Sequence, residues 1–324
     1  MKIKILFLIQ FLFISILNGN ILLNEEFSPK SQAIAGASVA FSEPEAGNIL
    51  TNPAGISGLK GINYQVGWSG IISDEIGINY EYVLAGMPLP KKKLGNIGIG
   101  VFFFNLGGNL SIYDETGIQI DTINANSFML NISYANTVWI PNTIEKINYG
   151  INIKYFNSKL QYINSSGIGI DMGLNYKLTV KLFNLKIPQD NLSLGLKLEN
   201  IGYETGYYER KSLPFRIRIG GGYKIIPEKI SSNWLLEIFT EFDYNTLDYS
   251  DSGYLSEKIG MNIDFSKNFS IRIGYKIEPK RKTSGFSAGF GLNYKINKTV
   301  VGIDYGLGFF DLSTRHLIAI KGNF

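Results

Sequence analysis

The chain has 324 residues, of which 45% are hydrophobic and 13% aromatic, and its formal net charge is +4. So small a charge argues against a broad nucleic-acid surface, and we expect no nucleic-acid partner. The sequence has no cysteine and one histidine, His316, which excludes disulfides and most ligand sets for zinc, copper or iron. We therefore expect no metal site and no cofactor.

The first twenty residues have the features of a secretory signal peptide. Lys2 and Lys4 supply a positive start, and residues 5–17 are almost entirely apolar. That run is typical of a signal and shorter than the roughly 20 apolar residues of a membrane helix. The alternative, an uncleaved anchor helix, is less favoured for this reason. We predict a signal peptide over residues 1–20.

A short compact motif follows in residues 47–57, which read GNILTNPAGIS. Asn52 can cap a helix whose first position is taken by Pro53, because the missing N–H of proline costs nothing there. Gly55 would then limit the helix or begin a return turn. A type I turn with proline second and glycine fourth is the alternative. Both interpretations predict a small, mostly apolar element.

Alternation of apolar and polar residues dominates the chain after residue 60. In one example, Phe128, Leu130 and Ile132 fall on one face of a strand, while Asn131 and Ser133 fall on the other. Such segments predict about fourteen strands, an even number as in bacterial outer-membrane barrels. We place them near 62–68, 75–84, 96–104, 127–140, 146–160, 166–178, 191–200, 214–225, 234–245, 256–265, 269–278, 284–295, 299–309 and 313–324.

A closed membrane barrel explains these strands better than a soluble β-sandwich does. Many strands reach about ten residues, the length that a tilted membrane strand needs, whereas soluble strands average about half of that. Trp68, Trp139 and Trp234 lie at segment ends, as expected for rings at the two membrane interfaces. We therefore predict an all-β, antiparallel outer-membrane barrel that contacts the lipid bilayer and lipopolysaccharide-like lipids.

The C-terminal segment supports this interpretation. Phe324 ends the chain with Ile320 in step behind it, which resembles the terminal signal read by the barrel assembly machinery. If the last strand ends in the periplasm, the outer loops include residues 105–126, 201–213 and 246–255.

The N-terminal region supplies a plug for the barrel. A barrel of about fourteen strands lies between the smallest ones, filled by their side chains, and the porins with aqueous channels. Something should therefore occupy its lumen. We predict a signal peptide over 1–20, an N-terminal hatch over 21–60 and the barrel over 61–324.

Two motifs in residues 33–57 resemble the N-terminal signature of the FadL-like outer-membrane barrels, including the PorV/PorQ group and spirochaete-type relatives. One is a Gly-Ala-x-Val-Ala segment at residues 36–40, and the other is the Asn-Pro-Ala-Gly core formed by Asn52, Pro53, Ala54 and Gly55. An aromatic residue often precedes this asparagine in the family, whereas Thr51 stands there in this chain.

The resemblance implies a fourteen-stranded barrel with a hatch in its lumen and no enzymatic activity. Founding members of the family take up long-chain fatty acids and other hydrophobic compounds and pass them sideways through the barrel wall. The first expectation is therefore transport of a hydrophobic ligand. The alternative is a PorV-type role in secretion, in which the barrel binds exported proteins.

Charged residues on the predicted inner faces are candidate binding groups. Arg216 and Arg218 belong to a set of both signs that includes Glu237, Glu241 and Asp243. The favoured interpretation is that these charges pair with one another and with the hatch. The sharper hypothesis is that Arg216 and Arg218 bind the carboxylate of an amphipathic ligand while apolar hatch residues hold its tail.

Three further features carry weaker hypotheses. Gly107 and Gly108 interrupt the alternation and mark either a lateral opening in the wall or, as we favour, a loop entrance. His316 could belong to the catalytic triad of a barrel phospholipase, but no diagnostic serine motif accompanies it, so we predict no catalytic residue. The acidic run from Asp243 to Asp251 could bind calcium, but it lacks an EF-hand pattern and is better explained as a solvated loop.

Overall fold

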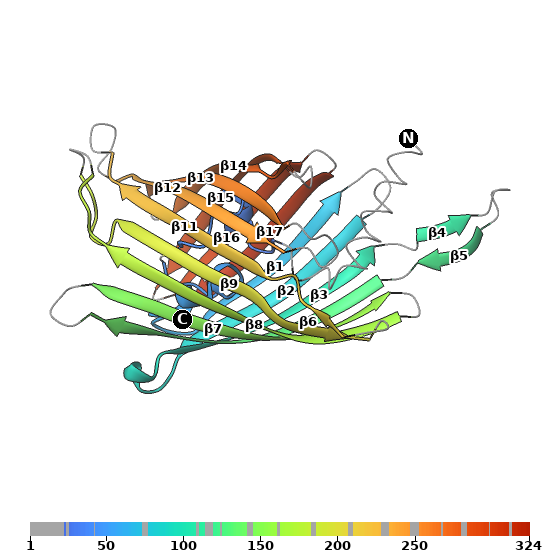
Figure 1. Cartoon of the computed structure of the whole chain (residues 1–324). Helices are drawn as coiled ribbons and strands as arrows, with labels where there is room; N and C mark the ends of the chain where they lie inside the picture. Colours follow the sequence, from blue (N-terminus) through green and yellow to red (C-terminus); the bar gives the residue numbers. More distant parts are fainter. Residues whose placement is uncertain are drawn as a thin grey trace.

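The computed structural model describes residues 23, 26–41, 43–72, 77–107, 110–113, 119–123, 125–140, 145–160, 163–182, 186–206, 210–227, 233–246, 253–266, 268–279, 284–297, 299–310 and 313–324. The predicted signal peptide lies outside these residues and stays a prediction. Within them, long antiparallel strands form a closed barrel, with short helices inside it (Figure 1).

Fourteen strands of the described chain build the barrel wall, which confirms the predicted fold class. They are β1 (Asn63–Ile72), β2 (Gly77–Pro88), β3 (Asn96–Gly107), β6 (Ala125–Trp139), β7 (Lys146–Leu160), β8 (Ile163–Leu178), β9 (Leu192–Thr205), β11 (Arg216–Ile225), β12 (Leu235–Asn245), β13 (Tyr254–Ser266), β14 (Phe269–Ile277), β15 (Gly285–Ile296), β16 (Thr299–Phe310) and β17 (Ser313–Asn323). The ring closes where β1 pairs with β17, with Asn63 opposite Asn323.

The structure also contains short strands that the sequence analysis missed. Inside the predicted loop 105–126, β4 (Leu110–Tyr113) and β5 (Gln119–Ile123) form a separate hairpin that stands clear of the barrel (Figure 1). A third strand, β10 (Lys211–Ser212), pairs with β9. The short helix η3 (Lys92–Leu94) lies in the turn between β2 and β3. These pieces lie in connections, where the alternation is too brief to reveal them.

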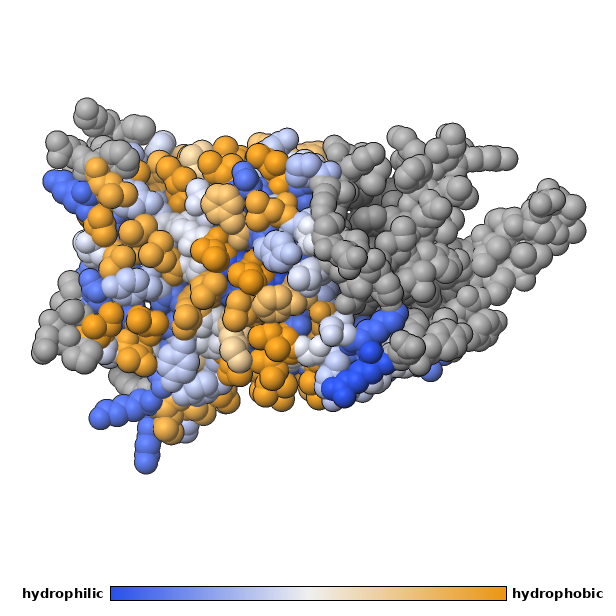
Figure 2. All heavy atoms as spheres, in the orientation of Figure 1, coloured by the Kyte–Doolittle hydropathy of each residue, from blue (hydrophilic) through white to orange (hydrophobic). Residues whose placement is uncertain are grey.

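The alternation sorts side chains between lipid and lumen. Outward-facing Ile99, Ile132 and Ile153 are 48%, 56% and 50% exposed, whereas their polar neighbours Asn131 and Asn152 point inward and are buried. Hydrophobic side chains cover the middle of the wall in Figure 2. This arrangement, apolar outside and polar inside, is that of a transmembrane barrel. Among the described residues, no helix is long and apolar enough to cross a membrane.

The described part of the hatch lies inside the barrel. Its helices are α2 (Pro29–Ala33), α3 (Asn48–Thr51) and the 3₁₀ helix η2 (Pro53–Ile56). α2 packs against β14 to β17, whereas η2 packs against β3 and β6 to β8. The segment therefore reaches well-separated parts of the inner wall.

The Asn-Pro-Ala-Gly core adopts the helical alternative rather than the type I turn. The Asn52 side chain caps η2 by accepting a hydrogen bond from the Ala54 N–H at 3.1 Å, and Pro53 takes the first helical position. The Asn52 amide also donates to the Val39 carbonyl at 2.8 Å and to the Leu174 carbonyl of β8 at 3.1 Å. One side chain thus caps the helix and ties the hatch to the wall.

Two glycines on the inner wall, Gly150 and Gly173, make room for this core, and we call them the glycine seat. A Cβ atom at Gly173 would lie 2.0 Å from Asn52 Oδ1, and one at Gly150 would lie 2.4 Å from the Pro53 carbonyl carbon. Both distances are far below van der Waals contact. Glycine is required at these two positions because the Asn52 side chain and the Pro53 backbone of the hatch approach the wall so closely.

We predict that Gly150→Ala loosens the hatch. The added methyl group overpacks the seat, at a cost of about 1–3 kcal/mol. Hydrogen exchange of residues 52–56 should therefore become roughly tenfold faster or more, while the heat-modifiable gel shift of the barrel is retained. Gly221→Ala is the matched control, because the nearest atom to its Cβ lies at an ordinary 3.7 Å. Equal exchange in the two variants would contradict the proposed seat.

Candidate functional site

One side of the barrel lumen is lined by aromatic rings. Tyr80 and Tyr82 of β2 and Phe102 and Phe104 of β3 point inward and are almost completely buried; we call these four residues the aromatic wall. The Tyr80 and Phe104 rings lie 5.2 Å apart, and those of Tyr82 and Phe102 lie 6.0 Å apart. Such a surface can bind an apolar molecule of flat or compact shape.

The chain itself occupies this surface. The Phe27 ring, just before α2, lies 5.5 Å from Tyr80 in an edge-to-face arrangement and 5.2 Å from Phe102. Phe27 is buried, as is Leu23 in the same apolar cluster. The N-terminal segment therefore supplies to the aromatic wall the contacts that a hydrophobic ligand would make.

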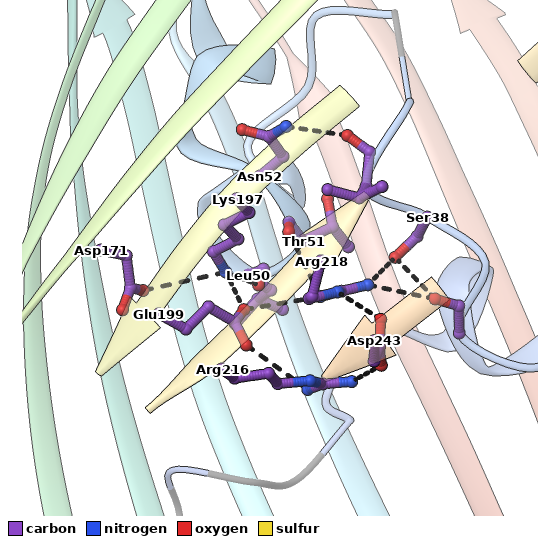
Figure 3. Close-up of polar contacts among 12 residues, drawn as sticks. Ser38, Leu50, Thr51, Asn52, Asp171, Lys197, Glu199, Arg216, Arg218 and Asp243 are labelled. Carbon is purple, nitrogen blue, oxygen red and sulfur yellow. Dashed lines mark hydrogen bonds and ion pairs between the residues drawn. The ribbon is translucent and has the colours of Figure 1, made fainter. Parts of the chain in front are cut away.

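The opposite side of the lumen carries a charge cluster, which we define as Lys154, Asp171, Lys197, Glu199, Arg216, Arg218, Glu241, Asp243 and Lys258. Within it, Arg218 Nε donates to Glu241 at 2.7 Å. Arg216 pairs with Asp243 and with Glu199 (Figure 3). Lys197 pairs with Glu199 at 2.5 Å. Buried charges require such partners because water is scarce around them.

The hatch backbone completes this cluster. The backbone N–H groups of Ser38 and Val39 donate to Glu241 Oε2 at 2.8 and 2.7 Å. Arg218 donates in the other direction, to the Gly36 carbonyl at 3.1 Å. Lys197 donates to the Leu50 carbonyl at 3.0 Å. Wall carboxylates accept from hatch N–H groups, and wall cations donate to hatch carbonyls. Removing the hatch would therefore leave charged groups of the wall partly unpaired.

A second group of ions holds the hatch at another part of the wall. Glu45 accepts from Lys30 at 3.0 Å and lies 3.5 Å from Lys321 of β17, which also pairs with Asp304 at 2.6 Å. Burial would lower the pKa of the Lys30 ammonium, but the facing Glu45 carboxylate raises it above its usual value. Burial would likewise raise the pKa of Glu45, but Lys30 and Lys321 hold it below its usual value. Both groups therefore stay charged at neutral pH.

The structure places Arg216 and Arg218 in the lumen, as predicted. Both are already engaged with carboxylates, and Arg218 also contacts the hatch. This matches the favoured interpretation that the inner charges pair with one another and with the hatch. Binding of a ligand carboxylate by the two arginines stays a prediction.

The predicted lateral opening falls at the end of β3. Gly107 is the last residue of that strand and pairs with Gly77 of β2, while Gly108 lies outside the described residues. The β3–β6 ladder runs without a register shift from Asn96 to Asn105. A lateral opening at these glycines stays a prediction.

Of the two remaining candidates, His316 does not form the site considered for it, and the calcium hypothesis is tested only at Asp243, because Asp248 and Asp251 lie outside the described residues. His316 faces outward, and its Nδ1 lies 2.7 Å from the Tyr305 hydroxyl rather than beside a serine. Asp243 of the acidic run points into the lumen and pairs with Lys258 at 2.5 Å, so it does not lie in a solvated loop. Within the described residues, no group of three potential metal ligands occurs.

Sequence reasoning missed the aromatic wall and, among the three carboxylate partners of the two arginines, Glu199. Half of the aromatic wall had a visible signal: in β2, Tyr80 and Tyr82 alternate with Asn79 and Glu81, the reverse of the pattern elsewhere, whereas Phe102 and Phe104 lie in a run of three phenylalanines. Asp171, Lys197 and Glu199 gave no such signal, because their proximity to Arg216 depends on the register of β8, β9 and β11.

Comparisons with known proteins identify the fold. The chain matches no protein-family model, and no curated protein is detectably similar in sequence. Among solved structures, it is similar to the monoaromatic hydrocarbon channel CymD, with a TM-score of 0.55 and 12% identity over 92% of this chain and 97% of that one. The P. putida toluene transporter TodX gives 0.55 and 12% over 90% and 96%. A Pseudomonas aeruginosa FadL homologue gives 0.54 and 8% over 93% and 99%.

These neighbours are transport channels of the FadL type, and at such low identity the likeness concerns the fold. The chain shares their barrel, and together with its apolar outer band this fold places the protein in the outer membrane.

We predict that Glu241→Gln releases residues 36–39 from the wall. The change keeps the shape of the side chain but removes the charge that Arg218 and Lys258 face, and breaking a buried ion pair costs about 3–5 kcal/mol. Hydrogen exchange at the Ser38 and Val39 amides should become roughly a hundredfold faster. Glu257→Gln is the control, because Glu257 lies on β13 and faces outward. Unchanged exchange in the Glu241 variant would show that the cluster does not hold the hatch.

Proposed function

We propose that this protein transports small hydrophobic molecules across the outer membrane and binds them at the aromatic wall. The observation that carries the proposal is the buried ring of Phe27 on Tyr80 and Phe102, since it marks a lumen surface built to hold an apolar group. The shared fold supports the same interpretation, because its solved neighbours include channels named for monoaromatic hydrocarbons.

A neutral ligand fits this lumen better than a fatty acid does. The aromatic wall offers rings and the Tyr82 hydroxyl, which accepts from the Gln65 amide at 2.8 Å. Arg216 and Arg218 already pair with Glu199, Glu241 and Asp243. A ligand carboxylate would have to displace these partners, and a buried carboxylate left unpaired is costly. We therefore favour uncharged, ring-containing or short aliphatic compounds as substrates.

Passage then requires the hatch to move. Phe27 and a ligand cannot occupy the same part of the aromatic wall, and the segments behind Phe27 are held by the charge cluster. The ligand displaces Phe27 first, and further travel along the lumen needs the hatch to shift from its glycine seat. Because the ligand then packs on the aromatic wall in place of Phe27, the apolar area buried there changes little and the exchange itself costs little.

A PorV-type role in secretion is the second candidate. It is supported by the β4–β5 hairpin, which stands clear of the barrel. Isolated two-stranded hairpins are marginally stable in water, and their free edges are sites for pairing with another chain. On this alternative the hairpin would carry the function, and changes in the aromatic wall would leave it intact.

Binding of a neutral naphthalene-type fluorophore to the purified barrel tests the transport proposal. Phe102→Ala should weaken binding about tenfold, because it removes an aromatic contact and part of the apolar surface. Phe27→Ala should strengthen binding, because it removes the internal competitor. Phe309→Ala is the matched control, since Phe309 of β16 faces outward, 47% exposed.

The same assay with a fluorescent fatty acid tests the arginine hypothesis. If Arg216 and Arg218 bind a carboxylate, replacing both by glutamine weakens binding of the fatty acid and not of the neutral probe. If the aromatic wall is the site, Phe102→Ala weakens both probes. Equal affinities in the Phe102→Ala and Phe309→Ala variants would refute binding at the aromatic wall.

A further inference from the structure

The outer surface of the same wall carries a polar hollow. A cavity of about 410 Å³ lies over β2, β3 and β6, with Asn79, Glu81, Phe103, Asn105, Asn126 and Phe128 among its lining residues. We call it the rim recess. Asn105 and Asn126 are exposed, and the Phe103 and Phe128 rings lie 5.5 Å apart. The recess is therefore a surface of amides and one carboxylate beside two exposed or half-exposed rings.

The recess lies at the edge of the apolar band. Asn79, Asn105 and Asn126 are directly opposite one another across three strands, near the ends of those strands. Two residues further along each strand come Glu81, Phe103 and Phe128, and the next outward row is Val83, Val101 and Leu130. An occupant would thus have its polar part among the amides and its apolar part against the valines.

On β2 the alternation is inverted, with Tyr80 and Tyr82 inward and Asn79 and Glu81 outward. On β12 and β13 the outward residues near this end mix apolar Phe242 and Ile259 with the polar Glu257, whereas the recess places three asparagines side by side. A row of three asparagines facing a membrane edge is costly unless the amides are hydrogen-bonded. The inversion therefore calls for a polar partner on the outside of the barrel.

The chemistry of the recess favours a neutral, hydroxyl-rich group. Each asparagine amide both donates and accepts, as a sugar hydroxyl does, and the Glu81 carboxylate accepts only. The carboxylate also disfavours a phosphate at the same place. Phe103 and Phe128 offer ring faces beside the amides, against which the C–H face of a sugar can pack.

We propose that the rim recess binds the sugar head group of a glycolipid in the surrounding leaflet. The sugar hydroxyls pair with Asn79, Asn105 and Asn126, and the acyl chains lie along the apolar band below. The lipid is the source of the sugar because the recess continues directly into the band that faces hydrocarbon. The lining of the recess also includes Phe104 of the aromatic wall, so the two sites share strands β2 and β3.

Native mass spectrometry of the full-length mature protein tests the proposal. The barrel is reconstituted with phosphatidylethanolamine and a minor fraction of either monoglucosyl diacylglycerol or the sugar-free diacylglycerol with the same chains. It is then released in mild detergent and the bound lipids are counted. The wild-type protein should retain the glucosyl lipid roughly tenfold over the sugar-free lipid, the factor expected for two or more added hydrogen bonds.

The paired variant is Asn105→Leu with Asn126→Leu, which should remove this preference. Glu257→Leu is the control, because Glu257 is an exposed polar residue near the same end of the barrel on β13, away from the recess. Equal retention of the two lipids by the wild-type protein would overturn the proposal and leave the recess as a solvated rim. An unchanged preference in the double variant, or an equal reduction in the control, would also overturn it. The wild-type comparison holds even if the double variant does not fold.

Discussion

The structure depends on how buried charge is paired inside the barrel. Inward side chains alternate with lipid-facing ones on every strand, so the wall brings lysines, arginines and carboxylates into a lumen filled by protein. Glu241 is neutralised by Arg218 and Lys258 and accepts two backbone N–H groups of the hatch. Arg218 in turn donates to a hatch carbonyl. The hatch and the wall thus share one hydrogen-bonded network, which fixes the hatch without any disulfide.

Because the residues of the charge cluster lie together on one side, the lumen has a charged half and an aromatic half. The charged half anchors the hatch, and the glycine seat at Gly150 and Gly173 positions its Asn-Pro-Ala-Gly core. In the part of the chain that the structure describes, the aromatic half holds the ring of Phe27 and apolar residues around it, so it can exchange one apolar occupant for another. In the proposed mechanism, a ligand competes with Phe27 at the aromatic wall, while the ionic contacts set how readily the rest of the hatch follows.

The sequence predicts the barrel well and the site poorly, for a physical reason. Alternation is a local property, so strands such as β7, predicted and observed at 146–160, could be located from their own residues. The cap formed by Asn52 and Pro53 is equally local. The pairing of Arg216 with Glu199 depends instead on the register between strands, and a shift of one residue would turn either side chain toward the lipid. Half of the aromatic wall was missed because its inverted alternation in β2 was counted as ordinary strand.

The central claim is that the hatch blocks the path of the ligand and must move for passage. Because the chain has no cysteine, a single reversible lock can be placed between hatch and wall. Ala40 and Ser193 suit it, since the Ser193 hydroxyl donates to the Ala40 carbonyl at 2.8 Å. Uptake of a neutral hydrophobic probe into vesicles is measured with the Ala40→Cys, Ser193→Cys protein, oxidised and then reduced. The account predicts that the oxidised form is blocked and that reduction restores uptake. Equal uptake in both forms would contradict it.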